Sequence, residues 1–278
     1  MKTLILAVAA LSVLVSAQAP PKALPLENLG LEHLDIVVPD TAASARFYAR
    51  LFKSPLHQQP VRDTLRYFIV LGDLPSDRQV GYIAIGAAGD RPPSIGHYCV
   101  LAKVYDRAGM ASTLQAAGFG VAAAGPTGMW PDPDRLELQL FQPPAGLVTA
   151  AVPSPLPAER DGLLTPRGVD HVMLRVSSLE KSLPYYRLVY GGTVERPRDA
   201  NGRVWLQLDR NTRIGLEAAA GQAPTIAHYA IKVAPFDRAA LEARLRELQA
   251  RILPSTDEPD VVRFADNNGI IVEVRVAQ

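Results

Sequence analysis

Histidine residues recur in this chain at places that suggest metal ligation. Four of the five histidines form two pairs: His33 and His97 are 64 residues apart, and His171 and His228 are 57 apart. Each lies in an apolar run that has the composition of a buried strand. A single histidine on an apolar strand is usually a hydrogen-bonded core residue, but a repeated pair is typical of two copies of one metal-binding fold.

The secondary-structure elements that would position these histidines repeat as well. A strand predicted at 31–38 is followed by Pro39-Asp40-Thr41, which supplies a turn and a cap, and then by a helix at 42–53. Three strand-like runs follow near 55–60, 65–71 and 79–86. The chain therefore begins with a β-α-β-β-β unit.

The same order of elements is predicted three more times. The second unit has a strand at 95–104, a helix at about 107–117 and strands near 119–124 and 135–142; the third has a strand at 169–176, a helix at 179–190 and strands near 193–197, 203–209 and 213–218; the fourth has a strand at 226–233, a helix at about 236–250 and strands near 252–255, 260–265 and 269–276. We therefore predict an α+β fold in which four units form two tandem domains.

The boundaries of the two domains follow from composition. Residues 143–167 hold many Pro and Gly residues and have no clear period, which places the boundary there. The predicted organisation is a linker at 20–29, a first domain at 30–145, a linker at 146–167 and a second domain at 168–278.

The first 19 residues have the form of a secretory signal peptide. Lys2 is followed by an apolar run, Leu4 to Val15, and then by Ser16-Ala17-Gln18-Ala19. The run is too short to span a bilayer comfortably, so cleavage is favoured over an uncleaved anchor. We expect a periplasmic or secreted protein with no membrane association after cleavage.

Charge and cysteine content restrict the partners. The 29 basic and 28 acidic residues nearly balance and form no basic run, so nucleic acid and anionic lipid are not expected as partners, and a small-molecule substrate is. Cys99 is the only cysteine, so no intramolecular disulfide can form even in an oxidising compartment. Stability must therefore come from packing.

With these elements in place, the chain resembles the vicinal oxygen chelate superfamily, which includes glyoxalases, extradiol dioxygenases and bleomycin-resistance proteins. The resemblance covers nearly everything after residue 30, and its opening motifs are His33 to Tyr48, with Phe47-Tyr48, and His171 to Tyr186, with Tyr185-Tyr186. It implies that each domain is a cupped mixed sheet with flanking helices. It also implies that two histidines on the first strands of successive units, and a carboxylate on the last strand, bind a divalent metal ion.

The last strands of the two domains differ in this carboxylate. The segment Asp266-Asn267-Asn268-Gly269-Ile270-Ile271-Val272-Glu273 resembles the family ending D-x-[DN]-G-x-x-x-E, so the favoured metal set is His171, His228 and Glu273. In the first domain, after Asp132-Pro133-Asp134-Arg135, Gln139 stands where the family has Glu. Glu137 shares a face with Gln139 and could supply the carboxylate if the strand shifted by one pair.

The first domain thus has a candidate set of His33 and His97 with Gln139 or Glu137, in which a neutral amide would weaken a site for a hard cation. Glu217 is a candidate fourth ligand of the second set, because glyoxalases of the superfamily use a carboxylate from a comparable strand. The alternative for Glu217 is an exposed glutamate at a strand end.

Three functions remain open at this point. The favoured one is an extradiol-dioxygenase-like enzyme that acts on a small oxygenated substrate at the second-domain site, because a 2-His-1-carboxylate triad suits Fe(II). Against it, Val261-Val262-Arg263-Phe264 lies where the dioxygenases have a tyrosine-bearing strand, and export makes Fe(II) harder to keep. The second is a glyoxalase-like lyase or isomerase with a redox-inert ion (Zn, Ni or Mn), and the third is a non-catalytic small-molecule binding protein of bleomycin-resistance type.

Overall fold

The computed structural model describes residues 23–72, 81–121, 128–142, 152–156, 162–191, 195–196, 198–254 and 259–277. The predicted signal peptide at 1–19 lies outside these residues. None of the helices in the described ranges has both the length and the apolar character needed to cross a membrane.

The elements follow the predicted order. The first half of the chain contains β1 (Asn28–Val38), α1 (Thr41–Leu51), β2 (Leu56–Val61), β3 (Thr64–Leu71), β4 (Gly81–Ala87), β5 (Ser94–Ala102), α2 (Arg107–Ala116), β6 (Met129–Pro131), β7 (Glu137–Phe141) and β8 (Val152–Pro153). The second half contains β9 (Pro166–Val176), α3 (Leu179–Tyr190), β10 (Glu195–Arg196), β11 (Val204–Gln207), β12 (Arg213–Ala218), β13 (Thr225–Val233), α4 (Arg238–Glu247), β14 (Arg251–Leu253), β15 (Val261–Ala265) and β16 (Ile271–Val276). The predicted α+β fold is confirmed.

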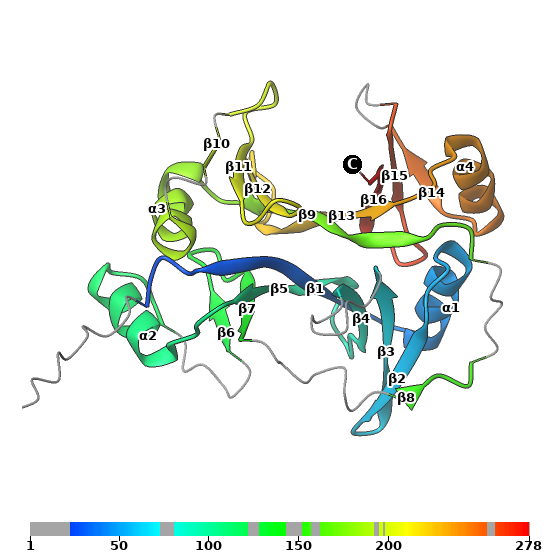
Figure 1. Cartoon of the computed structure of the whole chain (residues 1–278), viewed down its shortest axis with the longest axis horizontal. Coiled ribbons are helices and arrows are strands. Elements are labelled where there is room, and N and C mark those ends of the chain that lie inside the picture. The colour runs from blue at the N-terminus through cyan, green and yellow to red at the C-terminus, as the bar shows by residue number, and fades with distance from the viewer. Residues whose placement is uncertain are drawn as a thin grey trace, which may run out of the picture.

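Each half of the chain forms one mixed sheet of eight strands (Figure 1). The strand orders are β6-β7-β5-β1-β4-β3-β2-β8 and β10-β11-β12-β9-β13-β16-β15-β14. The first strands of the two units in each half lie side by side and antiparallel, β1 with β5 and β9 with β13. This arrangement brings the histidines of each pair, which are far apart in sequence, onto neighbouring strands.

The two sheets are stacked with β1 and β5 facing β9 and β13, and their outer strands bend away from one another (Figure 1). Alternate side chains of β1 and β9, among them Leu34, Ile36, Val172 and Leu174, belong to one apolar cluster between the sheets. Burial of each such side chain stabilises the fold by about 1.5–3 kcal/mol. Because side chains alternate along a strand, the histidines project to the opposite, concave face of each sheet. Each sheet is therefore a cup with its histidine pair on the inside.

A β-bulge lies beside the first histidine of each pair. On β9, His171 pairs with Ala230 and Val169 pairs with Ile231, which leaves Asp170 as an extra residue. The pairing of β1 with β5 shifts by one residue at the corresponding place, between Leu31 and Leu34. A bulge re-aims a side chain that would otherwise point to the other face. In both cups it turns the acidic residue before the histidine toward the imidazole ring.

The helix starts are capped as the sequence predicts. The side chain of Asp40 accepts a hydrogen bond from the backbone N–H of Ala43 at the start of α1, and the side chain of Ser178 accepts one from Lys181 at the start of α3. α3 ends at Gly191, whose φ of 87° is a conformation that favours glycine. These caps fix where each helix leaves its strand.

Three segments differ from the prediction. The proposed linker at 20–29 overlaps β1, and within it Leu24 and Leu26 are buried in the core. The proposed linker at 146–167 contains β8, which pairs with β2. In the segment near 119–124, residues 119–121 form no strand: the amide of Phe119 bonds to the carbonyl of Leu114, so this apolar residue belongs to the end of α2. Residues 122–127 lie outside the described residues.

Candidate metal centre

Three side chains meet on the floor of the second cup. The Nε2 atoms of His171 and His228 are 3.2 Å apart, and the two carboxylate oxygens of Glu273 lie 3.6 Å from Nε2 of His171 and 3.5 Å from Nε2 of His228. The residues come from the adjacent strands β9, β13 and β16, and all three are buried. An ion with bonds of about 2.0–2.2 Å to nitrogen and oxygen separates its neighbouring ligands by about 3–3.5 Å. The observed distances fit such an ion.

The protonation states of the two imidazoles also suit a metal ligand. Burial lowers the pKa of His171, and burial, with smaller effects of the neighbouring His171 ring and the charge of Arg263, lowers that of His228 well below its usual value. Both rings are therefore neutral at pH 7, which is the form of histidine that binds metal ions.

Asp170 orients the first of these rings. Its Oδ2 lies 2.7 Å from Nδ1 of His171, which places the imidazole proton on Nδ1 and leaves the lone pair of Nε2 directed at the triad. Burial would raise the pKa of Asp170, but the hydrogen bond from His171 and the charges of Arg213 and Arg275 outweigh it and lower that pKa to about 2. Asp170 is thus a carboxylate at pH 7 and supports His171 as a ligand.

His228 has a cation, Arg263, beside its Nδ1 atom, where His171 has the carboxylate of Asp170. Its guanidinium NH2 lies 3.4 Å from Nδ1 of His228, and its Nε lies 3.9 Å from Oε1 of Glu273. A guanidinium can only donate hydrogen bonds. It therefore cannot accept the proton that Nδ1 would carry when Nε2 binds a metal ion.

The first cup repeats the histidine geometry. The Nε2 atoms of His33 and His97 are also 3.2 Å apart, and Nδ1 of His33 lies 2.8 Å from Oε2 of Glu32. Burial lowers the pKa of His97 to about 3 and also lowers that of His33. The side chain of Gln139 opposes the effect of burial by raising the pKa of both rings. It pairs with Cys99 on β5 as Glu273 pairs with Ala230 on β13, so the amide occupies the place of the carboxylate.

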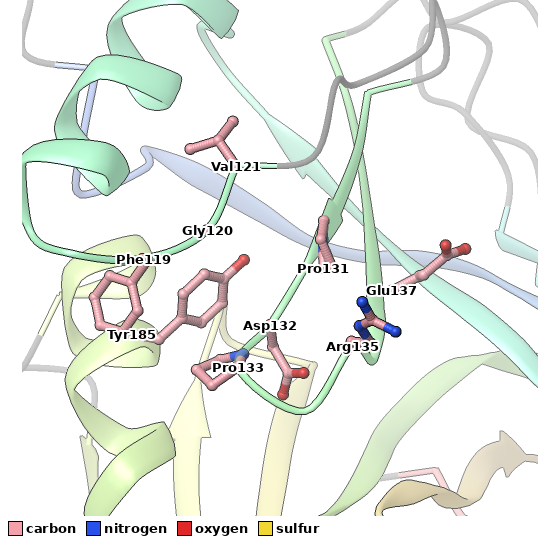
Figure 2. A pocket seen from close by; sticks show the side chains of 9 residues that line it. All are labelled: Phe119, Gly120, Val121, Pro131, Asp132, Pro133, Arg135, Glu137 and Tyr185. Atoms are coloured by element: carbon pink, nitrogen blue, oxygen red, sulfur yellow. The ribbon is translucent and has the colours of Figure 1, made fainter.

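Glu137 lies apart from the first histidine pair. It is exposed at the start of β7 and lines a cavity of about 460 Å³, where Figure 2 shows it near Arg135 and across from Tyr185 of α3. Among the described residues, the set of three mutually close potential ligands that contains His33 is Glu32, His33 and Cys99, and Glu137 is not part of it. The strand has not shifted to bring Glu137 into the cup.

Aromatic rings fill the first cup. His33 is stacked on Tyr82 with 4.4 Å between the ring centroids, and the ring of Phe141 is 6.2 Å from it. The corresponding positions of the second cup, read from the strand register, hold Arg213 and Arg275. The first cup therefore has uncharged aromatic rings where the second has two guanidinium groups.

Glu217, the candidate fourth ligand, is engaged elsewhere. Its Oε1 lies 2.9 Å from NH2 of Arg175 and accepts a hydrogen bond from Nε of the same arginine. Among the described residues, the donor atoms that gather in the second cup are those of His171, His228 and Glu273. The set of candidate ligands in the second cup thus has three members.

Sequence reasoning missed the residues that surround the triad, namely Asp170, Arg213 and Arg263. A signal for Asp170 was present, because each first histidine follows an acidic residue, in Glu32-His33 and in Asp170-His171. The two arginines had no such signal, since their approach to the triad depends on strand register.

No protein-family model matches the sequence, and no curated protein matches it. Similar solved structures include the 2,3-dioxygenase LapB from Pseudomonas sp. KL28, at 15% identity and a TM-score of 0.64, over 91% of this chain and 93% of that one. A Mn(II)-bound glyoxalase from Novosphingobium aromaticivorans has 17% identity and a TM-score of 0.63, over 90% and 82% of the two chains. A variant of homoprotocatechuate 2,3-dioxygenase from B. fuscum has 13% identity and a TM-score of 0.64, over 93% and 74%. The chain therefore has the same tandem fold as these dioxygenases and this glyoxalase.

Proposed function

We propose that this protein is a metal-dependent enzyme whose active site is the second cup, and that it oxygenates a small vicinal-oxygen substrate in the manner of an extradiol dioxygenase. The observation that carries the proposal is the convergence of His171, His228 and Glu273 within 3.6 Å of one another. A 2-His-1-carboxylate set leaves coordination positions open and is characteristic of non-haem Fe(II) oxygenases. When bound, the ion would supply Lewis-acid and redox chemistry to a substrate and oxygen at those positions.

The residues of the chain have separate roles in this proposal. Asp170 holds His171 in the tautomer that presents Nε2. The ring of Trp205 meets the ring of His171 edge-on, with 5.1 Å between centroids, and packs against it. Arg263 places a positive charge beside Glu273. A cation there would stabilise negative charge that develops on a substrate oxygen.

The second candidate is a glyoxalase-like lyase or isomerase that uses Mn, Zn or Ni. The fold similarity to a Mn(II)-bound glyoxalase favours it. It needs Glu217 as a fourth ligand, however, and Glu217 is paired with Arg175. The three-ligand set therefore favours the dioxygenase. A non-catalytic binding protein would have no use for a complete triad in one cup alone.

The location of the ion can be tested by substituting the second histidine of each pair, His228 in the second cup and His97 in the first. Metal content would be measured in the wild type, in His228→Ala and in the matched variant His97→Ala, after reconstitution with Fe, Mn, Zn or Ni. We expect one ion per chain in the wild type and in His97→Ala, and none in His228→Ala. Absence of metal from every form with all four ions would exclude both enzymatic candidates.

The reaction can then be assigned with two assays. Oxygen uptake with catechols would be followed after anaerobic loading with Fe(II), and turnover of α-keto aldehydes would be followed after loading with Mn, Zn or Ni. Uptake only in the Fe(II) form, abolished in His228→Ala, would support the dioxygenase. Turnover of the aldehyde without oxygen uptake would support the lyase instead.

We further propose that residues 1–19 are removed during export to the periplasm or the medium, because they have the three regions of a signal peptide. N-terminal sequencing of the protein from a periplasmic fraction tests this. An intact Met1 in the cytoplasmic fraction alone would contradict it.

A further inference from the structure

A polar cavity of about 350 Å³ adjoins the candidate metal centre at one end of the second cup. Its charged lining residues are Asp170, Arg210, Arg213, Lys232, Asp260 and Arg275. We call this cavity the basic pocket, because four of these six side chains are cationic. Its volume is at the lower end of the range for small-molecule sites.

The positive charge of the basic pocket exceeds what its own carboxylates neutralise. Asp170 is shared between Arg213, at 3.4 Å, and Arg275, at 4.0 Å, and it also accepts from His171. The ammonium of Lys232 donates to the backbone carbonyl of Asn211 at 2.8 Å, and within the described residues no carboxylate forms an ion pair with it. A half-buried cation without an anionic partner attracts an anion from solution.

Two residues that line the basic pocket, Asp170 and Arg275, each contact a member of the triad directly. Asp170, in its wall, bonds to His171, and NH1 of Arg275 lies 3.8 Å from Oε2 of Glu273. The guanidinium carbon of Arg213 lies 4.3 Å from the ring centroid of Trp205, which itself contacts His171. A ligand held in the basic pocket is therefore next to the candidate metal position.

The fold does not require these cations. The strand register places Tyr82, Leu101 and Phe141 in the first cup at the positions that Arg213, Lys232 and Arg275 occupy in the second. The first cup, with apolar residues at all three positions, has the same sheet and the same histidine geometry. The cations therefore distinguish the cup with the complete triad and point to the chemistry of its ligand.

We propose that the basic pocket binds the carboxylate of an anionic substrate, so that the second cup selects small oxygenated molecules that carry a carboxylate over neutral ones. Arginine side chains match the planar geometry of a carboxylate with two parallel hydrogen bonds, and Lys232 adds a third donor. The claim that the bound carboxylate belongs to the substrate of an oxygenase rests on the proposed function. The claim that the basic pocket binds a carboxylate is independent of that function.

The test is a calorimetric titration of the full chain, as purified and again after chelation of metal. The probes are 3,4-dihydroxybenzoate, the neutral catechol that lacks the carboxylate, and inorganic phosphate. We expect the carboxylate to bind at least about tenfold more tightly than catechol, the effect of one charge-assisted hydrogen bond. Equal affinity for catechol and the carboxylate would overturn the proposal. Equal affinity for phosphate and the carboxylate would also overturn it, because the pocket would then be a general anion site.

Two variants locate the binding site, and a third controls for overall charge. Lys232→Met removes a cation in the strand, and Arg210→Gln removes one in an exposed loop, where loss of folding is not expected. Each should weaken carboxylate binding by about threefold to tenfold and leave catechol binding unchanged. Lys181→Met, on the exposed side of α3, removes the same charge elsewhere and should change neither affinity. Unchanged carboxylate binding in both pocket variants would contradict the proposal.

The outcome is separable from that of the proposed function. Carboxylate binding that persists in the metal-free chain, without oxygen uptake in the Fe(II) form, would leave the basic pocket in place and exclude the dioxygenase. If the Fe(II) form takes up oxygen with both catechol and 3,4-dihydroxybenzoate, and binds the two with equal affinity, the dioxygenase would be supported. Selection of carboxylates by the basic pocket would be excluded.

Discussion

The hydroxyl of Tyr48 donates a hydrogen bond to Oδ2 of Asp266 across the two halves of the chain, at a distance of 2.8 Å. Tyr48 is on α1 of the first half, and Asp266 is in the turn before the last strand of the second. The reciprocal contact exists on the other side, where the hydroxyl of Tyr186 on α3 lies 2.6 Å from Oδ2 of Asp132. In both aspartates Oδ1 accepts two backbone amides of its own turn. The two tyrosine–aspartate pairs, Tyr48 with Asp266 and Tyr186 with Asp132, thus join the two halves of the protein.

Removal of one of these hydroxyls should destabilise the protein. Tyr186→Phe leaves the ring in place but deprives the buried Asp132 of a hydrogen-bond donor. We expect the free energy of unfolding in urea to fall by about 1–3 kcal/mol, since the lost bond is buried and involves a carboxylate.

The neighbouring residue provides the matched control. Tyr185 lies on the same helix and is equally buried, but its hydroxyl has no hydrogen-bond partner within the described part of the chain. Tyr185→Phe should therefore leave stability unchanged or raise it slightly. Equal losses in the two variants would mean that ring packing, and not the bond to Asp132, accounts for the effect.

The Nδ1 atoms of His171 and His228 have different neighbours, Asp170 and Arg263, and these contacts predict opposite effects on metal affinity. Asp170→Asn removes the anionic acceptor at Nδ1 of His171 and should weaken metal binding by about 10- to 100-fold. Arg263→Gln removes a cation beside Glu273 and gives Nδ1 of His228 a group that can accept its proton, so it should strengthen binding severalfold.

Competition with a chelator of known affinity measures both constants. The number of ions bound per chain should remain one in each variant, which would show that the triad still binds metal. Weaker binding in Arg263→Gln would show that Arg263 supports the site, contrary to the geometry at Nδ1.

The metal-free protein should lose stability below about pH 6.5. Burial lowers the pKa of all four paired histidines below the value of 6.5 that they have in the unfolded chain, to about 3 for His97. The unfolded state therefore binds protons first as the pH falls, and each histidine costs up to about 1.4 kcal/mol per pH unit until its folded pKa is reached. The stabilising contribution is complete above pH 6.5 and is lost on acidification.

Urea unfolding between pH 5 and 8 measures this dependence. Saturation with Zn should raise the stability at each pH without reducing the slope, because a bound ion also keeps His171 and His228 unprotonated in the folded state. A metal-free stability that does not change from pH 7 to pH 5.5 would contradict the assignment of neutral, buried imidazoles.

Gln139→Glu should give the first cup a metal-dependent stability. Without an ion the new carboxylate is buried beside His33 and His97, so the metal-free variant should be less stable than the wild type by a few kcal/mol. An added divalent ion would neutralise that charge and restore stability, with a stoichiometry that approaches two ions per chain. Thermal unfolding with and without metal measures this. A variant that is destabilised and gains nothing from metal would show that Tyr82 and Phe141 close the first cup to ions.

Sequence alone determined the order of elements and the donor residues of the triad. Strand and helix periods are local properties, so the alternation of apolar residues around His171 and the spacing from Asp266 to Glu273 could be recognised without a structure. The same reasoning placed a strand near 119–124, where an apolar residue, Phe119, instead packs edge-on against Tyr185. It also left Glu137 as a candidate beside Gln139, because the two residues share a face of the strand.

Tertiary structure decided what surrounds those donors. The bulge that turns Asp170 toward His171, the approach of Arg263 to Glu273 and the gathering of Arg213, Lys232 and Arg275 all depend on the register between strands. The contacts of Tyr48 with Asp266 and of Tyr186 with Asp132 depend on how the two sheets stack. Register and stacking are set by the packing of the whole core, and a difference of one residue would turn every such side chain to the other face. The sequence therefore specifies which residues can bind a metal ion, and the assembled core specifies which of them meet.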